Sequence, residues 1–229
     1  MTAPSARRGG ASRVRPPGLR GRDSASSGAI AEVVAGLGEC GLAIVRDFLP
    51  PRAIAALRSE ALRSDAAGGL AAAGVGRAAE RAIRSDVRGD RIRWLIERNP
   101  APAERVLHDA LAALRGAINR ELLLGLWEFE GHYALYPPGA GYARHRDSFR
   151  GRCNDPGERV VSCVLYLNED WQASDGGALR IYVADDAMRD VLPEAATLVA
   201  FLAAEFEHEV LPATRPRLAV TGWFRTRGS

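Results

Sequence analysis

The amino-acid sequence predicts a mainly β fold with N-terminal helices, in which a sandwich or jelly roll is flanked by α-helices. After Leu124, strand-like segments recur at near-regular spacing with Gly and Pro between them, a pattern typical of all-β sandwiches and jelly rolls. Before Leu124, apolar residues recur with the period of amphipathic helices. A length of 229 residues suits one large domain. We therefore expect a single domain over residues 29–226, with helical support at 29–123 and a jelly-roll core at 127–226.

The first 28 residues differ from the rest in composition. Residues 1–28 are rich in Gly, Pro, Ser and Arg, contain one acidic residue, Asp23, and show no apolar period. This composition predicts a disordered basic tail. A basic arm is a candidate for contact with nucleic acid, but a solvated tail is the favoured interpretation. The tail has no apolar stretch like that of a secretory signal.

Charge and cysteine content indicate which partners and which cellular compartment to expect. Every one of the 31 basic residues is Arg, and the net charge is only +3, so nucleic acid is not favoured as a partner of the near-neutral folded part. No apolar run approaches the length of a membrane span. Cys40, Cys153 and Cys163 lack paired metal spacing, which indicates free thiols. We expect a cytoplasmic, monomeric protein without membrane contact.

The helical half of the chain is expected to contain three helices. Apolar residues begin to recur at helical spacing from Ala29. Pro51 and Pro102 suit the first turns of two further helices, which should reach about Ser64 and Leu123. The other expectations here are strands at Leu42–Phe48 and Arg91–Leu95, a mobile loop at residues 66–79, and a helix-surface position for His108.

The second half is expected to contain seven strands. They are predicted at Trp127–Tyr136, Tyr142–Asp147, Val160–Leu167, Ala178–Val183, Thr197–Leu202, Val210–Pro212 and Arg217–Phe224. Alternate residues of a strand share a face, so Arg217, Thr221 and Trp223 lie on one side. By the same alternation, His132 lies on the side of Tyr136. A jelly roll would bring such faces into one interior.

A His-x-Asp pair supplies the first indication of chemistry. His145 and Asp147 would leave a strand on the same side and offer one nitrogen and one oxygen to a single point. Two His and one carboxylate form the facial site that holds Fe(II) with open positions, and His208 is the candidate third ligand. The pair alone also fits a surface strand with two polar residues. Together with His208, and with Arg217 nine residues later, it predicts an iron site.

Arg217 indicates what binds beside the metal. Its planar guanidinium makes two charge-assisted bonds to a carboxylate, and a buried Arg without an anionic partner is costly. If its strand face lines the barrel, the site implies a carboxylate-bearing co-substrate. The alternative is that Arg217 pairs with an acid of the protein itself.

Longer motifs carry a family resemblance. They are Tyr136-Pro137, Gly141-Tyr142-x-Arg144-His145-x-Asp147, Tyr166-Leu167-Asn168-x-x-Trp171, Gly176-Gly177-x-Leu179-Arg180-Ile181, His208-Glu209-Val210, Arg217…Trp223-Phe224 and Arg88-Gly89-Asp90-x-Ile92-x-Trp94. With these motifs the chain resembles the 2-oxoglutarate- and Fe(II)-dependent oxygenases, in the prolyl 4-hydroxylase branch that includes bacterial relatives of the animal oxygen-sensing enzymes. The likeness covers most of residues 29–226 and implies a double-stranded β-helix, the jelly roll of that family.

The resemblance also implies roles for particular residues. It implies that His145, Asp147 and His208 bind iron. It implies that Arg217 and Tyr166 hold the distal carboxylate of 2-oxoglutarate and that Tyr136 approaches its metal-bound carboxylate; Thr221, on the face of Arg217, joins them as a candidate cofactor-binding residue. The candidate substrate-binding residues are Arg159, Trp223, Arg88, Asp90 and His132.

The chain departs from the animal enzymes at three places. Segment Ser148–Glu158 differs in length and composition, and His132 stands in place of an apolar residue. The chain ends five residues after Phe224, so the substrate-gripping C-terminal helix of the animal enzymes is expected to be missing. These departures concern the substrate and leave the iron chemistry untouched.

The implied reaction hydroxylates an unactivated C–H bond while 2-oxoglutarate and O2 give succinate and CO2, with ascorbate as a candidate reductant. The expected substrate is C4 of a prolyl residue in a cytosolic protein, with elongation factor Tu as the lead candidate because it is a target of bacterial relatives. The runner-up is a small molecule or a free amino acid. A nucleic-acid demethylase of the same superfamily would be expected to show a second Arg behind the co-substrate and a basic face.

Two other function classes fit less well. A zinc hydrolase uses similar ligands but has no need for Arg217 and Tyr166 behind the metal. A catalytically silent jelly-roll binding module has no need for all three ligands.

His132 lies outside the motif set, and two roles remain open for it. It is expected to line the substrate or co-substrate pocket near the open iron position, or to be a neutral imidazole hydrogen-bonded to a neighbour. Iron ligation is not favoured because three ligands are already present. An ordinary imidazole pKa near 6.5 predicts a pH effect on activity between about pH 6 and 7.

Overall fold

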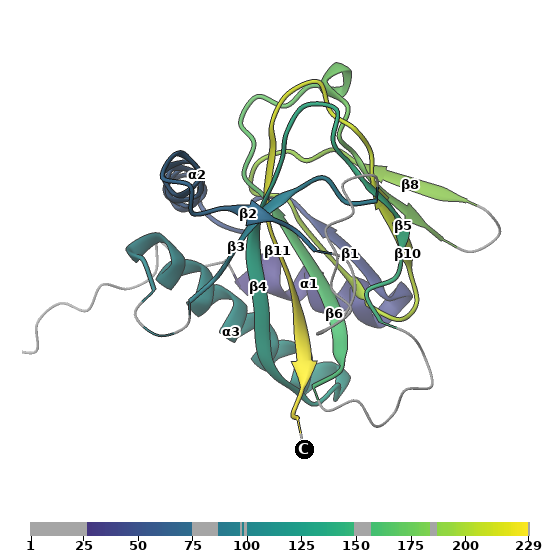
Figure 1. Ribbon diagram of the computed structural model, residues 1–229. Coiled ribbons are helices and arrows are strands. Elements are labelled where there is room, and N and C mark those ends of the chain that lie inside the picture. Colours follow the sequence, from purple (N-terminus) through teal and green to yellow (C-terminus); the bar gives the residue numbers. More distant parts are fainter. Residues whose placement is uncertain are drawn as a thin grey trace, which may run out of the picture.

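The computed structural model describes residues 27–74, 87–96, 98, 100–148, 157–183 and 187–228. Most of the predicted tail, at residues 1–26, lies outside the described residues, as do Cys153 and residues 75–79 of the expected loop. The described chain forms two antiparallel sheets and three helices (Figure 1). This confirms the prediction of a mainly β fold with N-terminal helices.

The helices are α1 (Ser27–Cys40), α2 (Pro51–Ala66) and α3 (Pro102–Leu122). Proline occupies the first turn of α2 and α3, where its missing N–H costs nothing. The Glu104 carboxylate accepts the Ala101 N–H at 3.2 Å and so satisfies one free donor at the start of α3. Leu123 ends α3 in the left-handed region, with φ 57°. The predicted helix starts are therefore met to within two residues.

The major sheet has seven strands in the order β1-β9-β6-β11-β4-β3-β2. Their bounds are Leu42–Val45, Leu198–Leu202, Arg159–Tyr166, Arg217–Thr226, Leu126–Tyr136, Arg91–Trp94 and Ala71–Ala72. The minor sheet has the order β5-β10-β7-β8, with bounds Tyr142–His145, Glu207–Val210, Leu179–Tyr182 and Met188–Val191. A short 3-10 helix lies at Ala173–Asp175.

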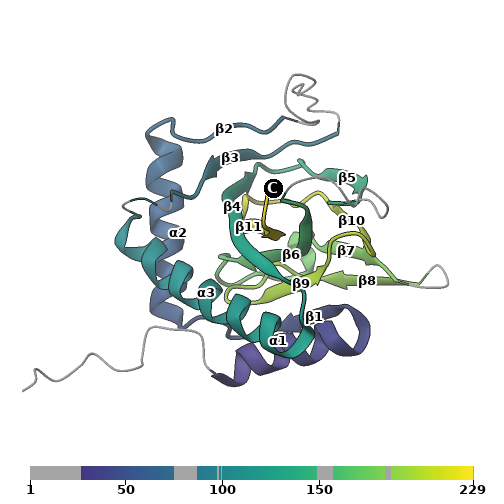
Figure 2. The ribbon, with the colours of Figure 1, turned by 90° about the horizontal axis from the view of Figure 1, so that it is seen from below.

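Alternation along the strands divides the interior into two cores. On β11, Leu218 and Val220 join the cluster that contains the buried faces of the three helices. Ala219, between them, joins a second cluster with Leu179 and Ile181 of the minor sheet. The helices therefore cover one face of the major sheet, and the minor sheet covers the other (Figure 2). Side chains that point between the sheets form the candidate site.

Three strands differ from the sequence prediction. β8 was not expected, because three of its four residues are exposed at a sheet edge and give no apolar signal. The strand expected at Val210–Pro212 lies earlier, at β10, because His208 and its flanking Glu residues are the ones that pair. β2 falls within the expected loop, held there by pairing with β3. None of the helices in the described part of the chain is long and apolar enough to cross a membrane.

Candidate metal and co-substrate site

Three potential metal ligands converge between the sheets. His145 ends β5, Asp147 follows two residues later, and His208 lies on the neighbouring β10, where its Cα is paired with that of His145. The Nε2 atoms of His145 and His208 lie 3.7 and 3.6 Å from the two carboxylate oxygens of Asp147. Their ligand atoms all lie within 4.8 Å of one another. The residues that the sequence singled out are thus placed to hold one metal ion.

Backbone carbonyls orient both imidazoles. Nδ1 of His145 lies 2.8 Å from the carbonyl oxygen of Ala143, and Nδ1 of His208 lies 3.4 Å from that of Phe206. An Nδ1–H that donates to a carbonyl leaves the Nε2 lone pair free for a metal. The Tyr142 ring stacks on His145 with centroids 3.7 Å apart and fixes the plane of that imidazole.

The protonation states suit metal binding. Burial would raise the pKa of Asp147, but the two histidines and a 2.6 Å hydrogen bond from Ser162 Oγ hold that pKa well below its usual range. Burial also lowers the pKa of His208, against the opposing pull of Asp147. An ionised carboxylate and neutral imidazoles are the forms that bind a metal. Nothing in the sequence indicated this bond from Ser162 to Asp147.

Arg217, at the start of β11, is 2% exposed and lies deeper in the pocket. Its Nε donates to the Gly177 carbonyl at 2.8 Å, while its buried Nη2 has no hydrogen-bond partner. The rings of Tyr136 and Tyr166 flank the guanidinium at 5.3 and 5.1 Å. Among the described residues no carboxylate forms an ion pair with Arg217, so the alternative of a protein acid as its partner is not seen.

The Tyr166 phenol is a second buried donor, and its O–H has no acceptor, because the neighbouring Arg217 can only donate. Burial raises the pKa of Tyr166 to about 12, so the phenol stays protonated at neutral pH. Burial likewise raises the pKa of Tyr136. Leaving a buried donor unsatisfied costs about 1–3 kcal/mol, and a carboxylate could accept from both Arg217 Nη2 and Tyr166. The donor set therefore fits a dicarboxylate such as 2-oxoglutarate, with one end at Arg217 and the other at the metal.

Nearly all predicted site residues line one pocket. Its walls are formed by Arg88, His132, Tyr136, Tyr142, His145, Asp147, Arg159, Ser162, Val164, Leu179, His208, Val210, Arg217, Thr221 and Trp223. Tyr166 is not part of these walls, but its ring lies beside the Arg217 guanidinium. Asp90 is buried behind the wall, where its two oxygens accept from Arg88 at 2.6 and 2.9 Å.

His132 is 1% exposed, and its Nε2 lies 3.4 Å from Nη2 of Arg88. Burial, and then the charge of Arg88, lower the pKa of His132 to about 4. The expectation that His132 titrates between pH 6 and 7 is therefore wrong, because the ordinary imidazole pKa does not survive burial beside a cation. His132 is not placed to bind the metal: among the described residues, the group of potential metal ligands consists of His145, Asp147 and His208.

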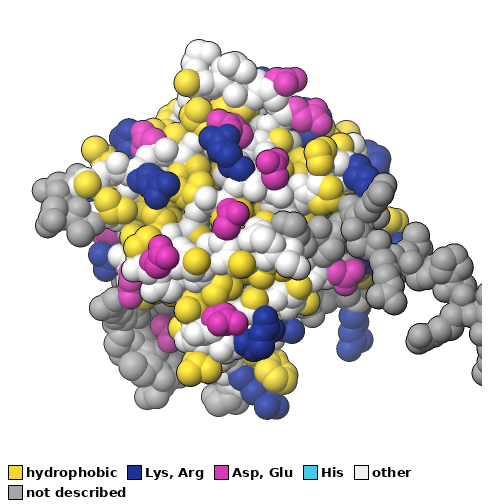
Figure 3. Space-filling view, turned by 180° about the vertical axis from the view of Figure 1, so that it is seen from behind, with side chains coloured by type: hydrophobic (Ala, Val, Ile, Leu, Met, Phe, Trp, Pro, Cys, Tyr) yellow, Lys and Arg dark blue, Asp and Glu magenta, His cyan; other side chains and the backbone are white. Residues whose placement is uncertain are grey.

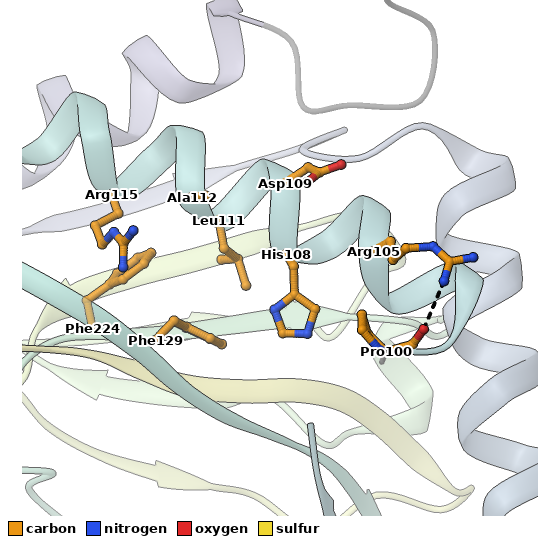
Figure 4. A pocket seen from close by; sticks show the side chains of 9 residues that line it. All are labelled: Pro100, Arg105, His108, Asp109, Leu111, Ala112, Arg115, Phe129 and Phe224. Carbon is orange, nitrogen blue, oxygen red and sulfur yellow. Dashed lines mark hydrogen bonds between the residues drawn. The ribbon is translucent and has the colours of Figure 1, made fainter. Parts of the chain in front are cut away.

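A larger cavity of about 350 Å³ lies elsewhere, between α3 and the strands β4 and β11. Figure 4 shows His108, Leu111 and Arg115 pointing from α3 toward Phe129 and Phe224. His108, expected at the helix surface, is half-buried there, and its Nε2 is buried without a hydrogen-bond partner. Among the described residues that line this cavity, no three are grouped as metal ligands.

Comparisons with known proteins agree with this geometry. The sequence profile of the 2OG-Fe(II) oxygenase superfamily matches residues 131–225. A crystal structure of a Pseudomonas putida prolyl-4-hydroxylase is 48% identical, with a TM-score of 0.78, over 86% of this chain and 98% of that one. A Trichoplax adhaerens prolyl hydroxylase, solved with a hypoxia inducible factor peptide fragment, is 27% identical, with a TM-score of 0.75, over 86% of this chain and 88% of that one.

Similarity extends to an animal protein of greater length. Human Egl nine homolog 1 is 34% identical over 148 residues, which cover 61% of this chain. The match covers 33% of the human protein. The matched part of this chain therefore spans about a third of the length of that relative.

Proposed function

This chain belongs to the 2OG-Fe(II) oxygenase superfamily, and we propose that it hydroxylates an unactivated C–H bond as an Fe(II)- and 2-oxoglutarate-dependent dioxygenase. In this reaction one atom of O2 enters the product hydroxyl and the other enters succinate, and CO2 is released from 2-oxoglutarate. The observation that carries the proposal is the pair of buried, unpartnered donors, Arg217 Nη2 and the Tyr166 phenol. They adjoin the pocket that contains the metal-ligand cluster.

The chain's residues have separate tasks in this proposal. His145, Asp147 and His208 would hold Fe(II), which supplies the O2 chemistry when bound. Arg217 and Tyr166 would hold the distal carboxylate of 2-oxoglutarate, and Tyr136 and Thr221 would line its binding site. The Ser162 hydroxyl fixes one carboxylate oxygen of Asp147 and so orients that ligand. A zinc hydrolase is not favoured, since it leaves the Arg217 and Tyr166 donors without a role.

The proposed substrate is C4 of a prolyl residue in a cytoplasmic protein, with elongation factor Tu as the lead candidate. Support comes from the 48% identity to the Pseudomonas putida prolyl-4-hydroxylase, of which the match covers 98%. The Trichoplax adhaerens relative binds a peptide, which supports a protein segment over the runner-up, a small molecule or free amino acid. We also propose that the protein acts as a monomer with ascorbate as reductant.

A nucleic-acid substrate is not favoured. On the face opposite to the one that Figure 1 presents, acidic and basic side chains are interspersed (Figure 3). The net charge of the chain is +3. Tight phosphate binding is typical of proteins that gather Lys and Arg on one face. Stimulation of 2-oxoglutarate turnover by single-stranded DNA or RNA would reverse this assignment.

The test is intact-mass analysis of elongation factor Tu after incubation with the protein, Fe(II), 2-oxoglutarate and ascorbate. The expected result is a gain of one oxygen atom, located at C4 of a proline by fragmentation and absent without 2-oxoglutarate. The Asp147→Ala variant is the matched control and should give no gain. If elongation factor Tu is unchanged while free proline or another small molecule is hydroxylated, the runner-up substrate class holds instead.

A further inference from the structure

The His132 ring has a definite proton position. The Arg88 guanidinium can only donate, so Nε2 of His132, 3.4 Å from Arg88 Nη2, is the accepting nitrogen. The ring is neutral at physiological pH, because burial and Arg88 lower the pKa of His132 to about 4. Its single proton is therefore on Nδ1. That buried Nδ1–H has no hydrogen-bond partner in another residue, and only the backbone carbonyl of His132 itself lies near it.

Trp223 places a second donor of the same kind beside it. The indole Nε1–H can only donate, and here it is buried without a partner. His132 and Trp223 come from the neighbouring strands β4 and β11. Their rings pack edge to face with centroids 5.7 Å apart, and both line the pocket that contains the metal-ligand cluster. Each unsatisfied buried donor is unfavourable, so two adjacent ones in a pocket point to an absent acceptor.

The charges around these two rings are already balanced. Arg88 is paired with Asp90 at 2.6 Å. Arg159, whose guanidinium lies 3.4 Å over the Trp223 ring, is paired with Glu130 at 3.3 Å. Arg225 also contacts Glu130, and its second partner is Glu128 at 3.5 Å. No uncompensated cation among these described groups is left for an anion, so the missing acceptor is a neutral oxygen.

We infer that the Nδ1–H of His132 and the Nε1–H of Trp223 form a two-donor subsite for a main-chain carbonyl oxygen of the substrate at or next to its target proline. This inference rests on the proposed function and narrows its substrate class. Proline has no backbone N–H and offers only a carbonyl, so a wall of unpartnered donors complements a prolyl segment. A free amino acid would instead bring a carboxylate to a charge-balanced wall.

The experiment measures peptide affinity without turnover. The protein is loaded with Mn(II) in place of Fe(II) and with 2-oxoglutarate, and the dissociation constant of a synthetic prolyl peptide from elongation factor Tu is measured by calorimetry. A matched series replaces one carbonyl oxygen at a time by sulfur, a weaker acceptor, at the proline and its two neighbours. We expect one sulfur position to weaken binding to the wild-type protein about 3- to 10-fold.

Two variants identify the donor. His132→Phe keeps a ring but removes one of the two donors. It should bind the parent peptide about 3- to 10-fold more weakly and respond less than the wild type to the sulfur substitution, because only Trp223 still donates. His132→Asn also removes the Arg88 contact at Nε2 but retains an N–H donor near the Nδ1 position, and should keep the wild-type affinity to within about twofold. Melting temperatures show whether each variant is folded, and the sulfur series in the wild-type protein does not depend on any variant.

The outcomes separate the subsite from the proposed function. If the wild-type protein binds no prolyl peptide, the proposed function and the subsite both fail. If it binds the peptide but every sulfur position is silent, or if His132→Phe responds to the sulfur substitution as the wild type does, the subsite fails and the proposed function stands.

Discussion

At the scale of single residues, the co-substrate end of the pocket depends on two donors that the protein leaves unused. Of the guanidinium nitrogens of Arg217, Nε donates a hydrogen bond to the Gly177 carbonyl. Its Nη2 and the Tyr166 phenol stay buried and unpaired. Each unpaired buried donor costs about 1–3 kcal/mol, and a bound ligand that accepts from both would remove that cost.

Replacing Arg217 by Lys tests this role. Lysine keeps the charge but loses the planar fork, so the loss of charge-assisted bonds should cost about 2–3 kcal/mol of 2-oxoglutarate binding. We expect the KM for 2-oxoglutarate to rise by roughly 30- to 150-fold, with a much smaller fall in kcat at saturating co-substrate. Steady-state succinate release measures both values. An unchanged KM would show that Arg217 serves the fold alone.

His132 makes stability depend on pH. Its pKa is about 4 in the folded protein and near 6.5 when unfolded, so the unfolded chain binds a proton more readily between these values. The contribution of the neutral His132 to the free energy of unfolding is fully present above pH 6.5. It is lost as the pH falls toward 4, and the loss is on the order of 2–3 kcal/mol. We expect the melting temperature of the wild-type protein to fall more steeply from pH 7 to 4.5 than that of His132→Phe. Parallel curves would contradict a neutral, buried His132.

The site could be predicted from sequence where spacing encodes geometry. His145 and Asp147 share a face because they are two residues apart, and Arg217 follows His208 at a distance that suits two consecutive strands of the chain, which lie in different sheets. The bond from Ser162 to Asp147 could not be predicted, since a strand serine has many possible partners. The pKa of His132 could not be predicted either, because it depends on burial and on Arg88.

At the scale of elements, the turn before β7 positions Arg217. Gly176 and Gly177 both have positive φ, at 70° and 69°, a conformation that favours glycine. The Gly176 carbonyl accepts the Trp171 indole N–H at 3.0 Å, and the Gly177 carbonyl accepts from Arg217. A Cβ on Gly177 would lie 2.9 Å from the Ala213 Cβ and 3.4 Å from the Arg217 Cδ.

Gly177→Ala should therefore damage stability and co-substrate binding together. The left-handed backbone costs alanine about 1–2 kcal/mol, and the contact with Ala213 adds to it. We expect a lower melting temperature and a raised KM for 2-oxoglutarate. Gly68→Ala is the matched control, since Gly68 has φ 72° with nothing near its added Cβ. Gly68→Ala should lower the melting temperature and leave the KM for 2-oxoglutarate unchanged. If both variants have the same KM for 2-oxoglutarate, the turn at Gly177 has no role in co-substrate binding.

Elements were predictable where burial gives a pattern. The three helices bury apolar stripes at helical spacing, and the long strands β4, β6 and β11 bury continuous runs of residues. The edge strand β8 buries one residue of four, so no pattern marks it. β10 was misplaced because its residues serve the site: His208 and two Glu residues do not resemble a strand core.

At the scale of the whole molecule, the metal-ligand cluster lies on the minor sheet while Arg217 starts a strand of the major sheet. A metal and 2-oxoglutarate bound together would therefore connect the two layers. The helices stabilise the opposite face of the major sheet and leave this space free.

Metal binding should stabilise the fold. A metal held at 100 times its dissociation constant adds about 2.7 kcal/mol, which for a chain of this size raises the melting temperature by roughly 5–10 °C. We expect this shift with excess Mn(II), its reversal by a chelator, and its loss in His208→Ala. A shift of equal size in His208→Ala would place the metal elsewhere.

The fate of O2 tests the proposed function most directly. Elongation factor Tu or its prolyl peptide is incubated with the protein, Fe(II) and 2-oxoglutarate under oxygen-18 gas, and both products are analysed by mass spectrometry. The expected result is one labelled oxygen in a C4-hydroxylated proline and one in succinate, in equal amounts. Hydroxyl oxygen derived from water, or labelled proline without labelled succinate, would contradict a 2-oxoglutarate-dependent dioxygenase.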